Sequence, residues 1–236
     1  MRYQEYKAPI ELSSWVKLFW IFENRTNDPV PEKIVADGFP ELIVHFRSPF
    51  SEPDQVGKFF TQPTALVCGQ LTRPLMLHSS PDAGMIGIRF HPNGLAPFLS
   101  TPMYEMTDSR IPAEHLLGNV NQLIESVVEA KTDLQRIAAC THFLVQSLRS
   151  KFPNSEVRYL LNRINQTRGR ITVETLANKT GLSRRRMELI FRNEIGISPK
   201  LFCRIARFRH VFDFMTNSNQ EIKWVNMALD SGFWIL

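Results

Sequence analysis

The stretch ITVETLANKTGLSRRRMELIFRNEIGISPKLF, residues 171–202, decides how the C-terminal part of this chain folds. A helix-turn-helix needs a small residue where its two helices approach, and a glycine that can adopt a left-handed conformation at the turn. Ala177 and Gly181 meet both needs. Thr172 and Ser183 stand where they can cap the first and the second helix. The spacing therefore predicts two short helices that meet at a sharp corner at Gly181.

Apolar side chains must fill the angle between these two helices. The outer face of the second helix is then mostly cationic. The predicted seam consists of Leu176, Leu182, Met187 and Ile190. The residues left on the outer face are Arg184, Arg185, Arg186, Glu188, Leu189 and Arg192. Arginine suits phosphate oxygens and base edges, so the helix 184–195 is predicted to enter the major groove of double-stranded DNA. The alternative is a helical hairpin whose arginines are simply solvated.

The expected DNA contacts divide into groove and backbone contacts. Arg184, Arg185, Glu188 and Arg192 are expected to face the groove. Leu189 is expected to lie against a thymine methyl group. Thr172, Ser183 and Lys200 are expected near phosphates.

A long helix is predicted to follow the first two. Ser198 can cap it, and Pro199 occupies its first turn, where a missing amide hydrogen costs nothing. Apolar residues then recur at alternating steps of four and three, which predicts one continuous buried stripe. The stripe consists of Leu201, Ile205, Phe208, Phe212 and Met215.

The helix-turn-helix spacing begins a second time near the end of the chain, at Met227, Ala228, Gly232 and Phe233. Two such units joined by one stiff helix would reach successive major-groove segments about 34 Å apart. The chain ends at Leu236, before the residues of a second recognition helix. We therefore expect a truncated second unit and a frayed C-terminus, or else a protein that binds through one complete unit.

This organisation resembles the DNA-binding domain of the AraC/XylS family of bacterial transcriptional regulators, which contains two helix-turn-helix units. The resemblance covers residues 154–233 and implies a sequence-specific transcription factor. Leu189 departs from the family, which often carries an arginine facing the bases at that position. The matching residues are Leu176, Ala177, Gly181, Ser183, Arg185, Met187, Phe191, Gly196, Ile197, Ser198, Pro199, Phe202 and Arg207.

The charge distribution agrees with a nucleic-acid partner for the C-terminal part. Residues 1–150 hold 13 Lys and Arg against 16 Asp and Glu, whereas residues 151–236 hold 15 against 7. The second part is therefore strongly basic, and its field attracts a polyanion.

Length and composition favour a soluble protein with two domains. The chain has 236 residues, of which 43% are apolar, enough for two packed cores. No run approaches the roughly 18 apolar residues of a membrane span, and the first residues lack a signal-peptide core. We therefore expect a cytoplasmic protein without a membrane partner. The cysteines, Cys68, Cys140 and Cys203, are widely spaced, so neither disulfides nor zinc are expected.

Short apolar runs separated by turn-forming residues predict a β-rich N-terminal domain, in the form of a small barrel or sandwich. The runs are Trp15–Phe22, Glu41–Arg47, Thr64–Leu71 and Met85–Phe90. A helical turn is expected within 93–99. A barrel interior lined by Trp15, Phe19, Phe46 and Phe90 could hold an apolar ligand, although a filled core is the main expectation.

The N-terminal part also resembles the corresponding domain of a subset of AraC-like regulators, which implies a module that binds a small-molecule effector or forms a homodimer. The matching residues are Ala36, Asp37, Gly38, Glu41, Leu42, Ile43, Cys68, Gly69, Gln70, Gly87, Ile88, Arg89, Phe90, Pro92 and Gly94.

Catalysis has no positive signal in the sequence. His45, His78 and His91 lie on or beside predicted strands, and a metal-dependent enzyme of the cupin type would gather histidines there. Such sites normally contain two histidines separated by one residue, a pattern that this chain lacks. No nucleophile elbow, phosphate-binding glycine loop or zinc-protease helix is present. We expect no catalytic residue, no metal and no cofactor.

The sequence thus predicts an α+β chain of two domains. Residues 1–150 form a β-rich effector or dimerisation domain closed by helices within 119–149, and residues 151–236 form an all-α DNA-binding domain. Pro153 marks the boundary. The main alternative is a ligand-binding or protein-interaction module whose DNA-binding half is impaired by truncation.

Overall fold

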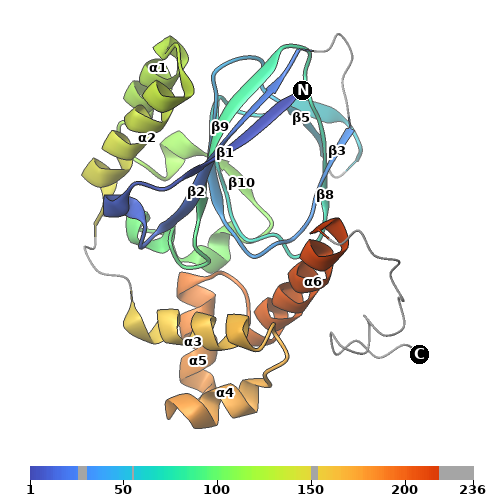
Figure 1. Cartoon of the computed structure of the whole chain (residues 1–236), viewed down its shortest axis with the longest axis vertical. Coiled ribbons are helices and arrows are strands. Elements are labelled where there is room, and N and C mark those ends of the chain that lie inside the picture. Colours follow the sequence, from blue (N-terminus) through green and yellow to red (C-terminus); the bar gives the residue numbers. More distant parts are fainter. Residues whose placement is uncertain (26–30, 55, 150–153, 218–236) are drawn as a thin grey trace.

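The computed structural model describes residues 1–25, 31–54, 56–149 and 154–217, and has an antiparallel β-barrel followed by helices (Figure 1). The predicted α+β class is confirmed. The barrel is built from two sheets. The six-stranded sheet has the order β1 (Arg2–Lys7), β2 (Val16–Asn24), β9 (Ala83–Phe90), β4 (Glu41–His45), β7 (Ala65–Cys68), β10 (Arg110–Pro112). The four-stranded sheet has the order β3 (Pro31–Ile34), β8 (Leu75–His78), β5 (Ser51–Pro53), β6 (Phe59–Thr61).

The predicted strands form the centre of the six-stranded sheet. They correspond to β2, β4, β7 and β9, whose runs of apolar residues are buried on both faces of the sheet. The other strands are short or polar and were not predicted. β1, for example, consists mostly of exposed polar residues and is held by pairing with β2 over its whole length. The expected helical turn is the 3-10 helix η2 (Ala96–Phe98).

Two helices cover the outer face of the six-stranded sheet. They are α1 (Val120–Glu129) and α2 (Asp133–Ser147), which lie on one side of the barrel in Figure 1. Thr132 caps α2 in a reciprocal capping box with Gln135, so the corner between the two helices is fixed by local hydrogen bonds. Leu123, Val127 and Phe143 pack from these helices against the sheet.

The four residues expected to line the barrel interior lie on the other face of the sheet. Trp15, Phe19, Phe46 and Phe90 belong to the core between the sheet and helices α1 and α2. A strand directs alternate residues to opposite faces, and the interior takes the other set, which includes Trp20, Phe22 and Phe50. The sequence pattern alone did not say which face would be covered by helices.

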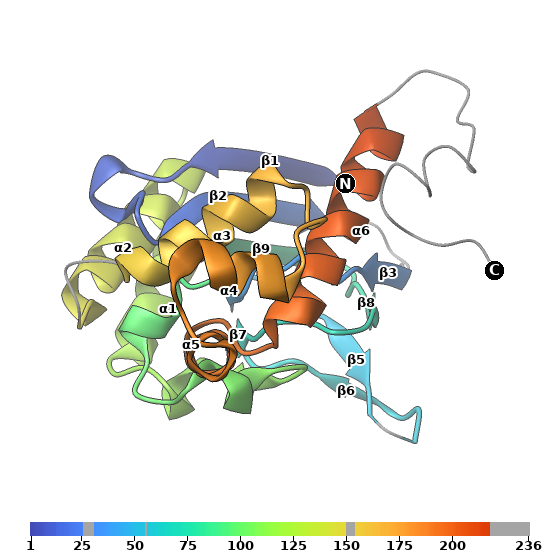
Figure 2. The ribbon, with the colours of Figure 1, turned by 90° about the horizontal axis from the view of Figure 1, so that it is seen from below.

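The C-terminal helices form a second core, separate from the first. Val157, Leu176, Phe191 and Phe202 are fully or almost fully buried within it. These helices lie below one end of the barrel, and Figure 2 shows α5 end-on beneath it. The helices are α3 (Ser155–Gln166), α4 (Val173–Thr180), α5 (Arg184–Glu194) and α6 (Pro199–Asn217).

The predicted stripe on α6 is buried only in its first half. Ile205 is buried and Leu201 is partly buried, but Phe208 is 42% and Phe212 is 40% exposed. The core that covers this helix ends before its last turns, so the second half of the stripe faces the space beside the barrel. The two phenylalanine rings stack on each other with centroids 6.1 Å apart.

The second helix-turn-helix repeat, with Met227, Ala228, Gly232 and Phe233, lies outside the residues that the structure describes. Among the described residues, no helix is both long and apolar enough to cross a membrane.

Candidate nucleic-acid interface

The corner between α4 and α5 has the predicted geometry. Gly181 ends α4 with φ +67°, a left-handed conformation that favours glycine. Thr172 begins α4, where its hydroxyl accepts a hydrogen bond from the backbone N–H of Thr175 at 3.0 Å. Ser183 begins α5 in the same way and accepts from the N–H of Arg186 at 3.2 Å. Both caps and the turn are confirmed, and together they set the direction in which α5 leaves the corner.

The seam behind α5 is sealed as expected. Leu176 and Met187 are fully buried, and Ile190 is nearly so. Ala177 and Leu182 are partly buried against the same core. With its apolar face held in this way, α5 presents its opposite face to solvent.

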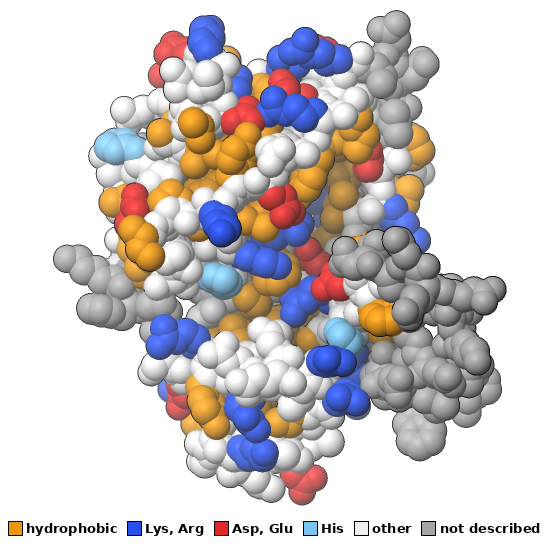
Figure 3. Space-filling view, in the orientation of Figure 1, with side chains coloured by type: hydrophobic (Ala, Val, Ile, Leu, Met, Phe, Trp, Pro, Cys, Tyr) orange, Lys and Arg blue, Asp and Glu red, His pale blue; other side chains and the backbone are white. Residues whose placement is uncertain are grey.

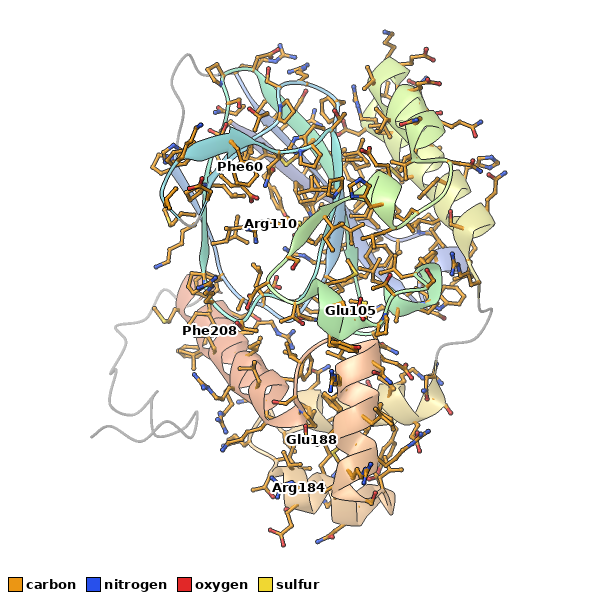
Figure 4. All side chains as sticks on the ribbon, turned by 180° about the vertical axis from the view of Figure 1, so that it is seen from behind. Phe60, Glu105, Arg110, Arg184, Glu188 and Phe208 are labelled. Carbon is orange, nitrogen blue, oxygen red and sulfur yellow. The ribbon has the colours of Figure 1, made fainter. Side chains whose placement is uncertain are left out.

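The exposed face of α5 carries most of the residues expected to contact DNA. Arg184, Arg185 and Leu189 are exposed, and Glu188 is half-buried. A shallow groove of about 430 Å³ runs along this face between α5 and the start of α6. Figure 4 shows Arg184 and Glu188 on the part of α5 that points away from the barrel.

Two arginines of α5 contact protein. The guanidinium of Arg192 lies over the ring of Tyr104 from the N-terminal domain, with its Cζ atom 4.1 Å from the ring centroid. Arg186 forms an ion pair of 3.7 Å with Glu156 on α3. Arg192 was expected to face the groove, and its contact with Tyr104 was not foreseen, because it joins two elements far apart in the sequence.

The expected phosphate contacts lie around the same helix. Thr172 and Ser183 are exposed at the first turns of α4 and α5, and Lys200 is exposed on the first turn of α6. Exposed hydroxyls and amines at helix N-termini are suited to bind phosphate oxygens. The structure thus leaves these three side chains accessible to solvent at the N-terminal ends of α4, α5 and α6.

A cleft of about 570 Å³ separates α6 from the barrel and was not predicted. Three cations surround the ring of Phe39 there: Lys17 Nζ lies 3.8 Å, Arg209 Cζ 4.8 Å and Arg89 Cζ 5.9 Å from its centroid. Figure 3 shows Lys and Arg side chains gathered over this junction. Burial beside α6 and the neighbouring Arg209 guanidinium lower the pKa of Lys17. The cleft therefore crowds positive charge around one aromatic ring.

The charges in the cleft are only partly compensated. Arg89 pairs with Glu41 at 2.7 Å and with Asp37 at 3.4 Å, which ties it to the barrel. Arg209 donates a hydrogen bond of 3.0 Å to the backbone oxygen of Asp37. Lys17 forms no ion pair with a carboxylate of the described residues within 4.0 Å.

The barrel interior contains a second, smaller cavity of about 270 Å³. Apolar side chains such as Trp20 and Phe22 form most of its lining, and the charged side chains of Glu41, Arg89 and Arg110 also reach it. Burial raises the pKa of Glu41, and the neighbouring Arg89 opposes that shift. The cavity is thus mostly apolar, with the paired charges of Glu41 and Arg89 beside it.

The three histidines do not meet in the barrel. His78 stacks on Phe59 with centroids 4.3 Å apart, and a ring nitrogen of His91 lies 3.2 Å from the backbone oxygen of Ser13. His45 is buried, and burial lowers its pKa to about 4. Among the described residues, no group of three or more His, Cys, Asp or Glu side chains is arranged to hold a metal ion.

Comparisons with known proteins found one matching family model and several similar solved structures. The family model described as Domain of unknown function (DUF6597) matches residues 4–112. No curated protein matches the chain. ToxT from Vibrio cholerae is a similar solved structure, with a TM-score of 0.48 and 9% identity over 99% of this chain and 90% of that chain. ToxT bound to an unsaturated fatty acid has a TM-score of 0.45 and 11% identity, covering 90% and 85%. The AraC-like transcriptional activator CuxR has a TM-score of 0.28 and 15% identity, covering 97% and 90%.

Proposed function

We propose that this chain is a DNA-binding transcriptional regulator of the AraC/XylS type, which reads the major groove with α5 and responds to a small molecule through its N-terminal half. The observation that carries the proposal is the complete helix-turn-helix: a left-handed glycine corner, two capped helices and a sealed apolar seam. Its outer face is cationic, and the segment around it holds the excess of positive charge. This combination suits a helix that enters a groove between phosphates.

In this function the residues of α5 have separate roles. Arg184, Arg185, Glu188 and Arg192 contact base edges or groove walls, because guanidinium and carboxylate groups match the donors and acceptors of bases. Leu189 lies on the same face and packs on a thymine methyl. Thr172, Ser183 and Lys200 contact phosphates and set the position of the helix on the duplex.

The salt dependence of DNA binding tests this function directly. The affinity of the full chain for duplex DNA is expected to fall linearly on a log–log plot against salt, with a slope of about −0.9 for each phosphate neutralised. A gel-shift series over increasing salt measures the slope. Lys200→Ala is expected to weaken binding to all sequences alike and to reduce the slope by about one.

The alternative function is a ligand-binding or protein-interaction module without DNA binding. It would be supported if the chain bound no duplex DNA at low salt, or if its affinity did not change with salt. The same titration therefore decides between the two functions.

The effector is proposed to bind in the cleft between α6 and the barrel. Lys17, Arg89 and Arg209 supply positive charge there, and the exposed rings of Phe208 and Phe212 supply an apolar wall. This lining suits a molecule with an anionic head and an apolar tail, such as a carboxylic acid with an alkyl chain. Because α6 belongs to the helical domain, a ligand in the cleft touches both halves of the protein.

A thermal melt with matched probes tests the cleft. Decanoate is expected to raise the melting temperature, and decanol, which has a comparable chain and no charge, is expected to raise it less. Lys17→Gln should weaken the binding of decanoate about fivefold, the effect of losing roughly 1 kcal/mol of charge interaction. Lys58→Gln, at an exposed position between β5 and β6 that does not line the cleft, is the matched control and should leave binding unchanged. Equal stabilisation by both probes would contradict an anionic ligand.

A further inference from the structure

The 3-10 helix η3 (Met103–Met106) of the N-terminal domain lies against the C-terminal end of the recognition helix. Figure 4 shows Glu105 at the end of α5 nearest the barrel, whereas Arg184 lies at the opposite end. The proposed DNA-reading surface and the sensing domain therefore share a direct contact. This contact does not involve the cleft beside α6.

A cation–π contact, a hydrogen bond and a close backbone approach connect η3 and α5, including the residues that directly follow each helix. The Arg192 guanidinium stacks over Tyr104 at 4.1 Å. The Thr107 hydroxyl donates a hydrogen bond of 2.7 Å to the backbone oxygen of Gly196. Gly196 has φ +100°, and a Cβ atom there would lie 2.8 Å from the Met103 carbonyl oxygen, so only glycine permits this approach.

The contact restrains one exposed cation of the surface proposed to read DNA. Arg185, Leu189 and Arg192 follow one another at intervals of four and three residues, so they lie on one face of α5. Stacking on Tyr104 covers one face of the guanidinium and fixes its direction, although its in-plane N–H groups stay exposed. Any contact with DNA that needs another direction of the Arg192 side chain must break the stacking on Tyr104.

The same short helix brings a negative charge to this face. Glu105 is exposed beside the end of α5, and no ion pair within 4.0 Å is found for its carboxylate among the described residues. Phosphates of a duplex lying along α5 would approach this carboxylate within roughly the Debye length of 8–10 Å at physiological salt. Like-charge repulsion then weakens binding further.

We propose that η3 is an intramolecular brake on DNA binding: Tyr104 holds the Arg192 side chain against the N-terminal domain, and Glu105 repels the phosphate backbone. This inference rests on the proposed function of α5 and adds how it is regulated. The sensing domain lowers DNA affinity while it contacts α5. A movement of η3 away from α5 frees Arg192 and removes the carboxylate together.

Replacement of Tyr104 tests the brake. Tyr104→Ala in the full chain is expected to raise affinity about threefold for a duplex selected from random DNA by the wild-type protein, since a partly exposed cation–π contact is lost. Tyr104→Phe keeps the ring and should bind like the wild type. In an Arg192→Ala background, Tyr104→Ala should have no effect, because the group that it releases is gone.

Replacement of Glu105 tests the electrostatic part. Glu105→Gln is expected to raise affinity at low salt, and the gain should vanish as salt increases. Glu114→Gln, an exposed carboxylate on the 3-10 helix η4 (Ala113–His115), is the matched control and should change nothing.

The outcomes separate the brake from the proposed function. Unchanged or lower affinity of Tyr104→Ala in a chain that melts like the wild type would overturn the brake and mean that Tyr104 positions α5 for binding. An equal gain in the Arg192→Ala background would also overturn it. If neither the wild type nor any of these variants binds duplex DNA at low salt, the proposed function fails and the brake fails with it.

Discussion

Arg185→Ala is expected to weaken specific DNA binding by roughly tenfold or more, the largest functional effect of any single change on α5. Arg185 is exposed near the start of the recognition helix, where such helices contact base edges. A bidentate arginine–guanine contact contributes about 1–3 kcal/mol of discrimination, and each 1.4 kcal/mol is a factor of ten. No side chain of the described residues forms an ion pair with Arg185 within 4.0 Å, so folding should not suffer.

The measurement compares a selected duplex with the same duplex scrambled. Arg185→Ala should lose most of its affinity for the selected sequence and little for the scrambled one. The ratio of the two affinities should therefore fall. Arg158→Ala on α3 removes the same charge from an exposed position outside α5 and should affect both sequences equally and slightly. If Arg185→Ala bound the selected duplex like the wild type, the assignment of α5 as the recognition helix would be wrong.

Phe191→Ala is expected to destabilise the C-terminal helices by about 3–5 kcal/mol, the range for removing a buried phenylalanine. Phe191 is completely buried on the inner face of α5, and its ring meets that of Phe202 on α6 edge-on at 6.0 Å. The substitution leaves a cavity where three helices meet. Since typical domains have only about 5–15 kcal/mol of stability, a large part of it would be lost.

Urea unfolding followed by circular dichroism measures this loss, because α3 to α6 are a large share of the helix in the chain. The midpoint for the helical domain should fall strongly, while the barrel, which has its own core, should unfold as before. Leu189→Ala, on the exposed face of the same helix, is the control and should leave the midpoint nearly unchanged. A similar midpoint for Phe191→Ala and wild type would contradict the packing described for α5.

The central strands of the barrel could be predicted from the sequence, but its edges could not. β2, β4 and β9 each contain a run of apolar residues, because most of their side chains are buried on both faces. β6 is three residues long and exposed, so its Phe-Phe-Thr run is too short to be recognised as a strand. It forms because β5 offers it hydrogen bonds.

The sequence by itself determined the corner of the helix-turn-helix. Gly181, Thr172 and Ser183 act on backbone groups within three residues of themselves, and the basic face of α5 follows from the helical period. Interactions over such short distances along the chain can be read from spacing.

Only the tertiary structure decided what surrounds these residues. The stacking of Arg192 on Tyr104, and the ring of cations around Phe39, join side chains from elements that meet only when the two cores dock. The exposure of Phe208 and Phe212 has the same origin, because the barrel stands beside α6 without covering it. A periodic pattern predicts that one face of a helix can be buried. The shape and position of the neighbouring domain determine whether that face is buried.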